Sequence, residues 1–147
     1  MDNHEIVFED YAFTMDEYFN EHKAVDRLVE EWEKHGKLIV AYDFDNTVFD
    51  YDKKGATYNQ MIELLKTCKK LGCTMIVFTC RSFDQYDVVE EYLKDKGIPY
   101  DFINENDPSV EFETSRKIFY SIFFDDRAGI KSAYEIMVRT IERRLER

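Results

Sequence analysis

Two pairs of aspartates in this chain follow apolar runs, and both pairs suit chemistry with oxygen ligands. Asp43 and Asp45 come directly after one such run, and Asp125 and Asp126 come directly after another. Short apolar runs of this kind predict strands buried on both faces of a parallel sheet. Ionised carboxylates at buried strand ends are unfavourable unless they are paired, hydrogen-bonded or bound to a metal. Because the carboxyl ends of parallel strands meet at one edge, the four acids predict a Mg²⁺ site.

The first pair has the arrangement of a nucleophile with a proton-transfer partner. The Asp43 carboxylate can attack phosphorus and form an acyl phosphate, which water then hydrolyses. Asp45 lies two residues further on, on the same side of an extended chain, so it can act as general acid and base. Asp125 and Asp126 can hold Mg²⁺ between a carboxylate and the phosphoryl group.

Five further residues are candidates for binding the phosphoryl group. Thr47 offers a hydroxyl and an amide near a predicted helix start, and Thr79 ends a third apolar strand with a second hydroxyl. Lys117 can neutralise the phosphoryl charge, but it directly precedes the last strand, so its neighbour Arg116 competes for that role. Arg81 lies just past Thr79, where a structural salt bridge and a substrate contact are both open.

In their order along the chain these motifs resemble those of the haloacid dehalogenase (HAD) superfamily of phosphohydrolases. The matching residues are Asp43-Phe44-Asp45-Asn46-Thr47, Thr79, Lys117 and Asp125-Asp126. The resemblance covers about residues 38–127 and implies that Asp43 is the nucleophile and Asp45 the acid and base. It also implies that Mg²⁺ binds directly to Asp126, to the Asp43 carboxylate and to the Asp45 backbone carbonyl, with Asp125 further out. Asn46, a further candidate for binding the substrate, stands where the family often has glycine, a variation that we treat as neutral.

The order of the predicted elements indicates an α/β protein. Apolar patterns and turn residues predict strands at 38–43, 74–79, 100–103 and 118–124, helices at 14–35, 58–71, 84–96 and 130–144, and a loop at 105–115. The expected fold is a Rossmann-like three-layer sandwich with a parallel sheet. The connections at 47–58 and 103–116 are too short to fold alone, so no cap domain is expected.

We expect a single domain over residues 1–147, with residues 1–36 as an N-terminal extension that carries an amphipathic helix. Thr14 with Glu17, and Ser82 with Gln85, predict capping boxes for two of the helices. The apolar stripe of the N-terminal helix includes Tyr18, Val25, Leu28, Val29 and Trp32. We expect this stripe to pack on the domain, with an oligomer contact as the alternative.

Composition limits the classes of partner. The chain has 31 acidic and 20 basic residues and a net charge of −11, which disfavours non-specific binding to nucleic acid. No apolar run approaches the roughly 20 residues that span a bilayer, and the first residues lack a secretory signal, so no membrane association is expected. Three cysteines without paired spacing predict no disulfide framework, which favours a cytoplasmic location.

These observations predict a Mg²⁺-dependent phosphomonoester hydrolase that forms an aspartyl phosphate. Its substrate would be a small or a bulkier phosphoester, because an open site without a cap admits both. A receiver-like phosphoacceptor domain is one alternative, but its acceptor aspartate stands alone on a central strand after an acidic pair. A non-catalytic binding protein with a HAD fold is the other alternative, and the full set of motif side chains argues against it.

Overall fold

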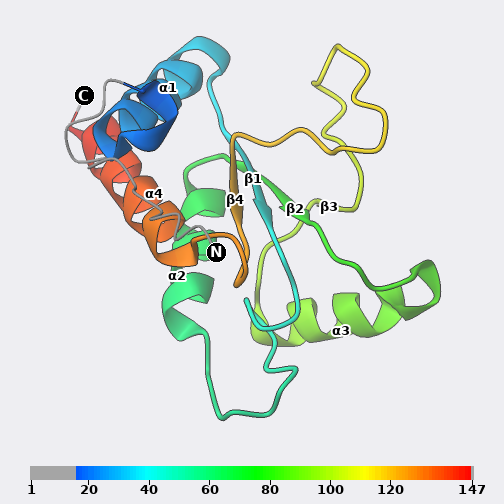
Figure 1. Ribbon diagram of the computed structural model, residues 1–147. Coiled ribbons are helices and arrows are strands. Elements are labelled where there is room, and N and C mark those ends of the chain that lie inside the picture. The colour runs from blue at the N-terminus through cyan, green and yellow to red at the C-terminus, as the bar shows by residue number, and fades with distance from the viewer. Residues whose placement is uncertain (1–15, 147) are drawn as a thin grey trace, which may run out of the picture.

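The computed structural model describes residues 16–146 and shows an α/β protein built on one parallel sheet (Figure 1). Its strands are β1 (Ile39–Tyr42), β2 (Thr74–Val77), β3 (Phe102–Ile103) and β4 (Ile122–Phe124). They lie in the order β3-β2-β1-β4, and every pairing is parallel. Helices flank the sheet, so the Rossmann-like fold class predicted from the sequence is confirmed.

The helices occupy the predicted regions, although two of them begin later than expected. They are η2 (Glu17–Phe19), α1 (Glu21–His35), α2 (Asn59–Lys70), η3 (Phe83–Gln85), α3 (Tyr86–Lys96) and α4 (Ile130–Leu145). Helix α1 starts at Asn20, whose side chain accepts a hydrogen bond from the Lys23 amide at 3.1 Å. The capping residue predicted for it, Thr14, lies outside the described residues.

The capping box predicted for α3 is wrong. The Ser82 hydroxyl donates to the Asp84 carboxylate instead of receiving a helix amide, and the turn after it is 3₁₀-helical. Gln85 precedes α3 and makes no side-chain capping bond. Asp84 therefore competes for the hydroxyl that the box requires, and α3 begins at Tyr86.

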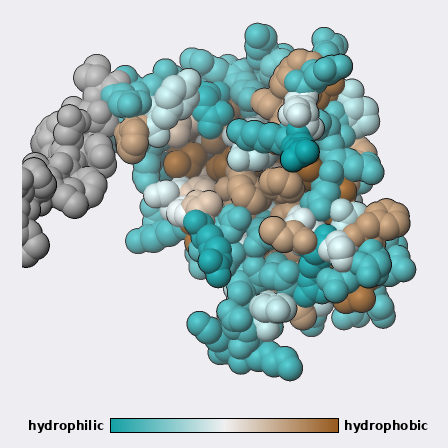
Figure 2. Space-filling view, turned by 45° about the vertical axis from the view of Figure 1, so that its right-hand side comes forward, coloured by the Kyte–Doolittle hydropathy of each residue, from teal (hydrophilic) through white to brown (hydrophobic). Residues whose placement is uncertain are grey.

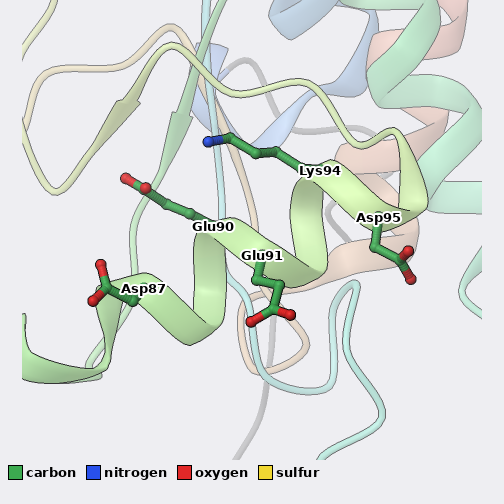
Figure 3. Close-up of a pocket in the computed structure, with 5 residues that line it drawn as sticks. All are labelled: Asp87, Glu90, Glu91, Lys94 and Asp95. Atoms are coloured by element: carbon green, nitrogen blue, oxygen red, sulfur yellow. The ribbon is translucent and has the colours of Figure 1, made fainter.

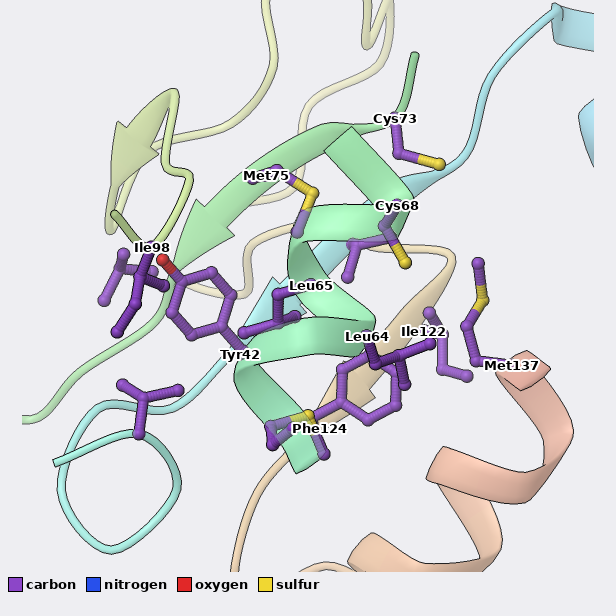
Figure 4. Packing of buried hydrophobic residues seen from close by; sticks show 14 of the residues in the cluster. Tyr42, Leu64, Leu65, Cys68, Cys73, Met75, Ile98, Ile122, Phe124 and Met137 are labelled. Carbon is purple, nitrogen blue, oxygen red and sulfur yellow. The ribbon is translucent and has the colours of Figure 1, made fainter. Parts of the chain in front are cut away.

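One face of the sheet carries the main hydrophobic core. Val40 and Tyr42 of β1 point to this face, and buried residues from all four α-helices pack against it. Figure 4 shows α2 lying across this face, with Leu64, Leu65 and Cys68 beside the strand residues. The predicted inward positions of α2 are all buried: Met61, Ile62, Leu65 and Cys68. The periodicity of α2 therefore fixes how it docks on the strands.

The opposite face of the sheet is covered by residues 104–121, which we call the 104–121 segment. This segment contains no helix or strand, which confirms the loop predicted at 105–115, whereas the strand predicted from residue 118 is absent before Ile122. Its Ile118 packs with Ile39 and Ala41 of β1 and Ile76 of β2. Figure 2 turns this side toward the viewer and shows apolar side chains in the middle of a mainly hydrophilic face. The layer on this face is thus irregular chain, and β4 begins only at Ile122.

Helix α1 packs on α4, as the amphipathic pattern predicts. Four of the five stripe residues, Val25, Leu28, Val29 and Trp32, are buried. Polar contacts support the packing: Ser132 Oγ donates to the Glu21 carboxylate at 3.0 Å, and Arg143 pairs with Asp26. The assignment of Tyr18 to the stripe is wrong, because Tyr18 lies in η2 and is 79% exposed.

Neither α1 nor any other helix among residues 16–146 has the length and apolar composition needed to cross a membrane. All three cysteines are free; Cys68 and Cys73 are buried and Cys80 is exposed.

Candidate active site

A tight turn after β1 places Asp43 at the carboxyl edge of the sheet. The Asp43 amide donates to the Phe124 carbonyl oxygen at 2.9 Å, so the pairing with β4 extends one residue beyond β1. Phe44 is buried in the core, and its carbonyl oxygen accepts from the amides of Thr47, Val48 and Phe49. Burial of Phe44 therefore anchors the turn and leaves the Asp43 side chain at the sheet edge.

Three carboxylates converge at this edge. Oxygen atoms of Asp43, Asp125 and Asp126 all lie within 4.8 Å of one another, and we call these three residues the acid cluster. Alternation along a strand would separate the side chains of Asp125 and Asp126. However, β4 ends at Phe124 and Asp126 lies in a turn, so both side chains reach Asp43. Both carboxylates are therefore within reach of one ion beside Asp43.

Thr47 links the members of the acid cluster. It is fully buried, and its hydroxyl donates to Asp43 Oδ2 at 3.3 Å. The oxygen of this hydroxyl, Thr47 Oγ1, accepts a hydrogen bond from the Asp126 amide at 3.1 Å. The hydroxyl thus joins the end of β1 to the turn after β4.

The environment of Asp43 disfavours its charged form. Burial, followed by the negative charge of Asp125, raises the pKa of Asp43 from 3.8 to about 7, and the nearby Asp126 adds to the rise. A positive ion among these oxygens would relieve this repulsion. Hard oxygen donors grouped in this way are the ligands that Mg²⁺ prefers, so the donor set fits the predicted ion.

The acidic side chains on α3 form a contrast to the acid cluster. They line a surface depression, and Figure 3 shows Asp87, Glu90, Glu91 and Asp95 on successive turns with carboxylates that point in different directions. Among residues 16–146, the acid cluster is the single group of three metal-ligating side chains close enough to share one ion.

Asp45 lies apart from the acid cluster because Arg81 holds it. Arg81 Nε donates to Asp45 Oδ2 at 3.0 Å and Nη2 donates to Oδ1 at 2.7 Å, so the guanidinium engages both carboxylate oxygens. The guanidinium carbon also lies 5.1 Å and 5.4 Å from the ring centres of Phe44 and Phe49. Of the two roles considered for Arg81, a structural salt bridge and a substrate contact, the structure contains the salt bridge.

Thr79 is held at the end of β2 by a residue that the sequence analysis missed. Asn104 Oδ1 accepts from the Thr79 amide at 2.8 Å, and Asn104 Nδ2 donates to the Thr79 carbonyl at 2.9 Å. The Thr79 hydroxyl accepts from the Arg81 amide at 3.1 Å. Asn104 directly follows β3 with a φ of 55°, a conformation in which asparagine is enriched. In the sequence, the feature that could have identified Asn104 is an asparagine at the carboxyl end of a predicted strand.

Lys117 and Arg116 are not brought to the acid cluster. The Ser121 amide donates to the Ile39 carbonyl at 2.8 Å, so the chain enters β4 at the amino end of β1, opposite the aspartates. Figure 1 shows the 104–121 segment beside the amino ends of the strands. Both basic residues are exposed, and Lys117 Nζ lies 5.7 Å from the Tyr120 ring centre. Neither contacts the acid cluster in the described part of the chain.

Asn46 shapes the connection that follows the turn. Its φ of 60° is in the left-handed region, which glycine adopts freely and asparagine tolerates. Its side chain donates to Asp52 at 3.0 Å and accepts from the Asp52 amide at 3.3 Å. Asn46 thus supports the connection between β1 and α2.

No protein-family model matches this chain, and no curated protein matches it. Among solved structures, a conserved protein from Bacteroides thetaiotaomicron is similar to it. The two share 24% sequence identity and a TM-score of 0.56, and the similarity covers 69% of this chain and 90% of the other. This likeness supports the Rossmann-like α/β fold described above.

Proposed function

We propose that the protein is a Mg²⁺-dependent phosphomonoester hydrolase that uses Asp43 as its nucleophile. The observation that carries the proposal is the acid cluster itself, in which three carboxylates from two strand ends meet within 4.8 Å. Such convergence raises the electrostatic energy of the fold, so a function that needs these charges together accounts for it best. The Thr47 hydroxyl adjoins this cluster, and the hydroxyls of Thr47 and Thr79 are of a type suited to phosphoryl oxygens.

The acid cluster would hold the ion, with Asp43 and Asp126 as direct ligands and Asp125 beside them. When bound, Mg²⁺ supplies positive charge that neutralises the phosphoryl oxygens and the neighbouring carboxylates. The Asp45 backbone carbonyl, expected as a further ligand, immediately follows the buried Phe44 at the same edge.

The chain's own residues would carry out two steps. In the first, a carboxylate oxygen of Asp43 attacks phosphorus, the bond to the leaving oxygen breaks, and Asp45 gives that oxygen a proton. In the second, Asp45 takes a proton from water while the water oxygen attacks phosphorus, which releases phosphate and restores the Asp43 carboxylate. Asp45 therefore ends the cycle in the protonation state in which it began.

Arg81 would fill the cationic role first assigned to Lys117 or Arg116. Its guanidinium is the cation in contact with a motif acid, and a planar fork binds phosphate and carboxylate with the same geometry. Phosphoryl oxygens would compete with Asp45 for this fork. That exchange would free the Asp45 carboxylate, which then takes up a proton from solvent and gives it to the leaving oxygen in the first step.

The contact between Arg81 and Asp45 also supports a second candidate, a phosphoacceptor domain. If Arg81 keeps both oxygens of Asp45 engaged, water activation is slow and the phosphorylated Asp43 persists. The two functions differ in the lifetime of the phosphoenzyme and not in its formation.

The experiment is a phosphomonoester panel with purified protein, in Mg²⁺ and in chelator, with a labelled phosphoryl group. We expect Mg²⁺-dependent turnover, no turnover or labelling for Asp43→Asn, and a persistent label for Asp45→Asn. General acid and base catalysis contributes about 10²–10⁴-fold, which is the expected loss of turnover for Asp45→Asn. Glu91→Gln, on the exposed face of α3, is the control. A stable label on the wild type without turnover would support the phosphoacceptor function, and near-normal turnover by Asp43→Asn would overturn both.

A further inference from the structure

A cavity of about 370 Å³ lies between the start of α2, the start of α4 and the turn after β1. Thr47 and Asp126 form part of its wall. Because the Thr47 hydroxyl also contacts Asp43 Oδ2 at 3.3 Å, the cavity opens directly beside the acid cluster. We call it the side cavity. A group attached to a phosphoryl bound at Asp43 would lie next to this cavity.

We propose that the side cavity binds the alcohol part of the phosphoester and that this part carries a planar ring, as in an aryl or nucleoside phosphate. The inference rests on the proposed phosphatase function and names the substrate class for the same site. The volume of the side cavity lies at the lower end of the roughly 300–1,000 Å³ typical of small-molecule sites, which is enough for one ring-bearing group.

The walls of the side cavity favour a ring over a chain of hydroxyl groups. Tyr58, just before α2, and Tyr134 of α4 are half-buried and present aromatic side chains, and Met61 and Ile130 add apolar surface. Aromatic rings stack favourably on one another, and a methionine side chain packs well beside a ring. A small polyol would leave hydroxyl groups against these apolar walls without hydrogen-bond partners, which is unfavourable.

The polar groups at the cavity are suited to an anionic ester with a polar ring edge. Lys131 stands on its wall with an 88% exposed side chain, and its Nζ is 3.9 Å from Glu135, so it can turn toward a bound anion. Gln60 offers an amide that can both donate to and accept from a ring edge. In a chain with a net charge of −11, a cation at this rim helps an anionic substrate to approach.

The experiment compares two matched pairs of phosphomonoesters in Mg²⁺. Benzyl phosphate is paired with ethyl phosphate, and uridine 5′-monophosphate with ribose 5-phosphate, so that each pair differs by a ring on a similar alcohol. We expect the wild type to have a KM about tenfold lower for at least one ring-bearing member, the effect typical of one stacked ring. Which pair shows the difference distinguishes an aryl from a nucleoside substrate.

Tyr134→Leu keeps apolar bulk but removes a ring face, so it should abolish the difference in KM between the two members of a pair. Tyr18→Ala is the control, because Tyr18 is 79% exposed on η2. Equal KM values within both pairs for the wild type, or an unchanged preference in Tyr134→Leu, would overturn the inference while leaving the phosphatase proposal intact.

Binding of benzylphosphonate and ethylphosphonate, measured by calorimetry, separates the two proposals when turnover is absent. Tighter binding of benzylphosphonate that Tyr134→Leu removes would support the ring site even if no ester is hydrolysed. Equal or undetectable binding of both, without turnover, would overturn the ring site together with the proposed function.

Discussion

Removing the charge of Asp43 should stabilise the protein in the absence of divalent cations. The pKa of Asp43 is raised from 3.8 to about 7, so the folded state holds this proton more tightly than the unfolded state does. That contribution to stability is complete below about pH 3.8 and is lost as the pH rises through about 7. Above this range the wild type must ionise Asp43 beside Asp125 and Asp126, whereas Asp43→Asn has no charge to place there.

The magnitude follows from the pKa. One pKa unit corresponds to about 1.4 kcal/mol, so a rise from 3.8 to about 7 sets an upper limit of about 4 kcal/mol. Because Asp43 is only partly buried, water and salt screen the repulsion, and we expect about 1–2 kcal/mol. In chelator at about pH 8, Asp43→Asn should therefore have the larger free energy of unfolding by this amount.

Urea unfolding of both proteins in chelator, at about pH 5 and about pH 8, measures the effect, with equal m-values required. The advantage of Asp43→Asn should grow with pH, and added Mg²⁺ should stabilise the wild type more than the variant. Glu91→Gln should show neither trend, because Glu91 is exposed on α3. A wild type that is at least as stable as Asp43→Asn at about pH 8 would refute the argument from crowded charge.

Three further results are expected. Arg81→Lys should lower the free energy of unfolding by about 1.5–3 kcal/mol in urea denaturation, because the two hydrogen bonds from the guanidinium to Asp45 are lost. The control is Arg139→Lys, at a surface pair, which should lower it by less than about 1 kcal/mol in the same assay. Burial of Asp107 opposes its ionisation, but hydrogen bonds from Lys37, Thr74 and Ser109 hold its pKa well below the usual range. Asp107→Asn should therefore lower the free energy of unfolding by about 2 kcal/mol near neutral pH, and by progressively less below about pH 4, in urea titrations. Asp126→Ala should raise the Mg²⁺ concentration needed for half-maximal activity more than Asp125→Ala does, and the reverse order in a metal titration would contradict the ligand assignment.

The apolar runs and the acids that follow them determined the core of this fold. A run such as 38–42 has no polar face, so it must be buried on both sides, and the amphipathic helices between such runs supply the cover. The carboxyl ends of parallel strands share one edge, so the meeting of Asp43 with Asp125 could be predicted without coordinates. The order of the elements also predicted the edge of the sheet at which these acids meet.

Local capping and strand ends could not be predicted as reliably, because neighbouring side chains compete for the same groups. Ser82 bonds to Asp84 and not to the helix, and the run that ends at Phe124 pairs over only three residues. β4 ends at Phe124, as predicted, but it starts only at Ile122, and Asp126 lies in the turn that follows, where its side chain reaches Asp43.

Only the tertiary structure decided which cationic side chain contacts an acid of the candidate site. Lys117 is close to Asp125 in sequence, but a strand lies between them and carries them to opposite edges of the sheet. Arg81 is far from Asp45 in sequence, but β1 and β2 are neighbours, so the turns after them bring the guanidinium onto the carboxylate. Asn104 reaches Thr79 in the same way across β2 and β3. Sequence patterns report burial and direction along one strand, whereas contacts between strand ends depend on strand order, which long-range packing selects.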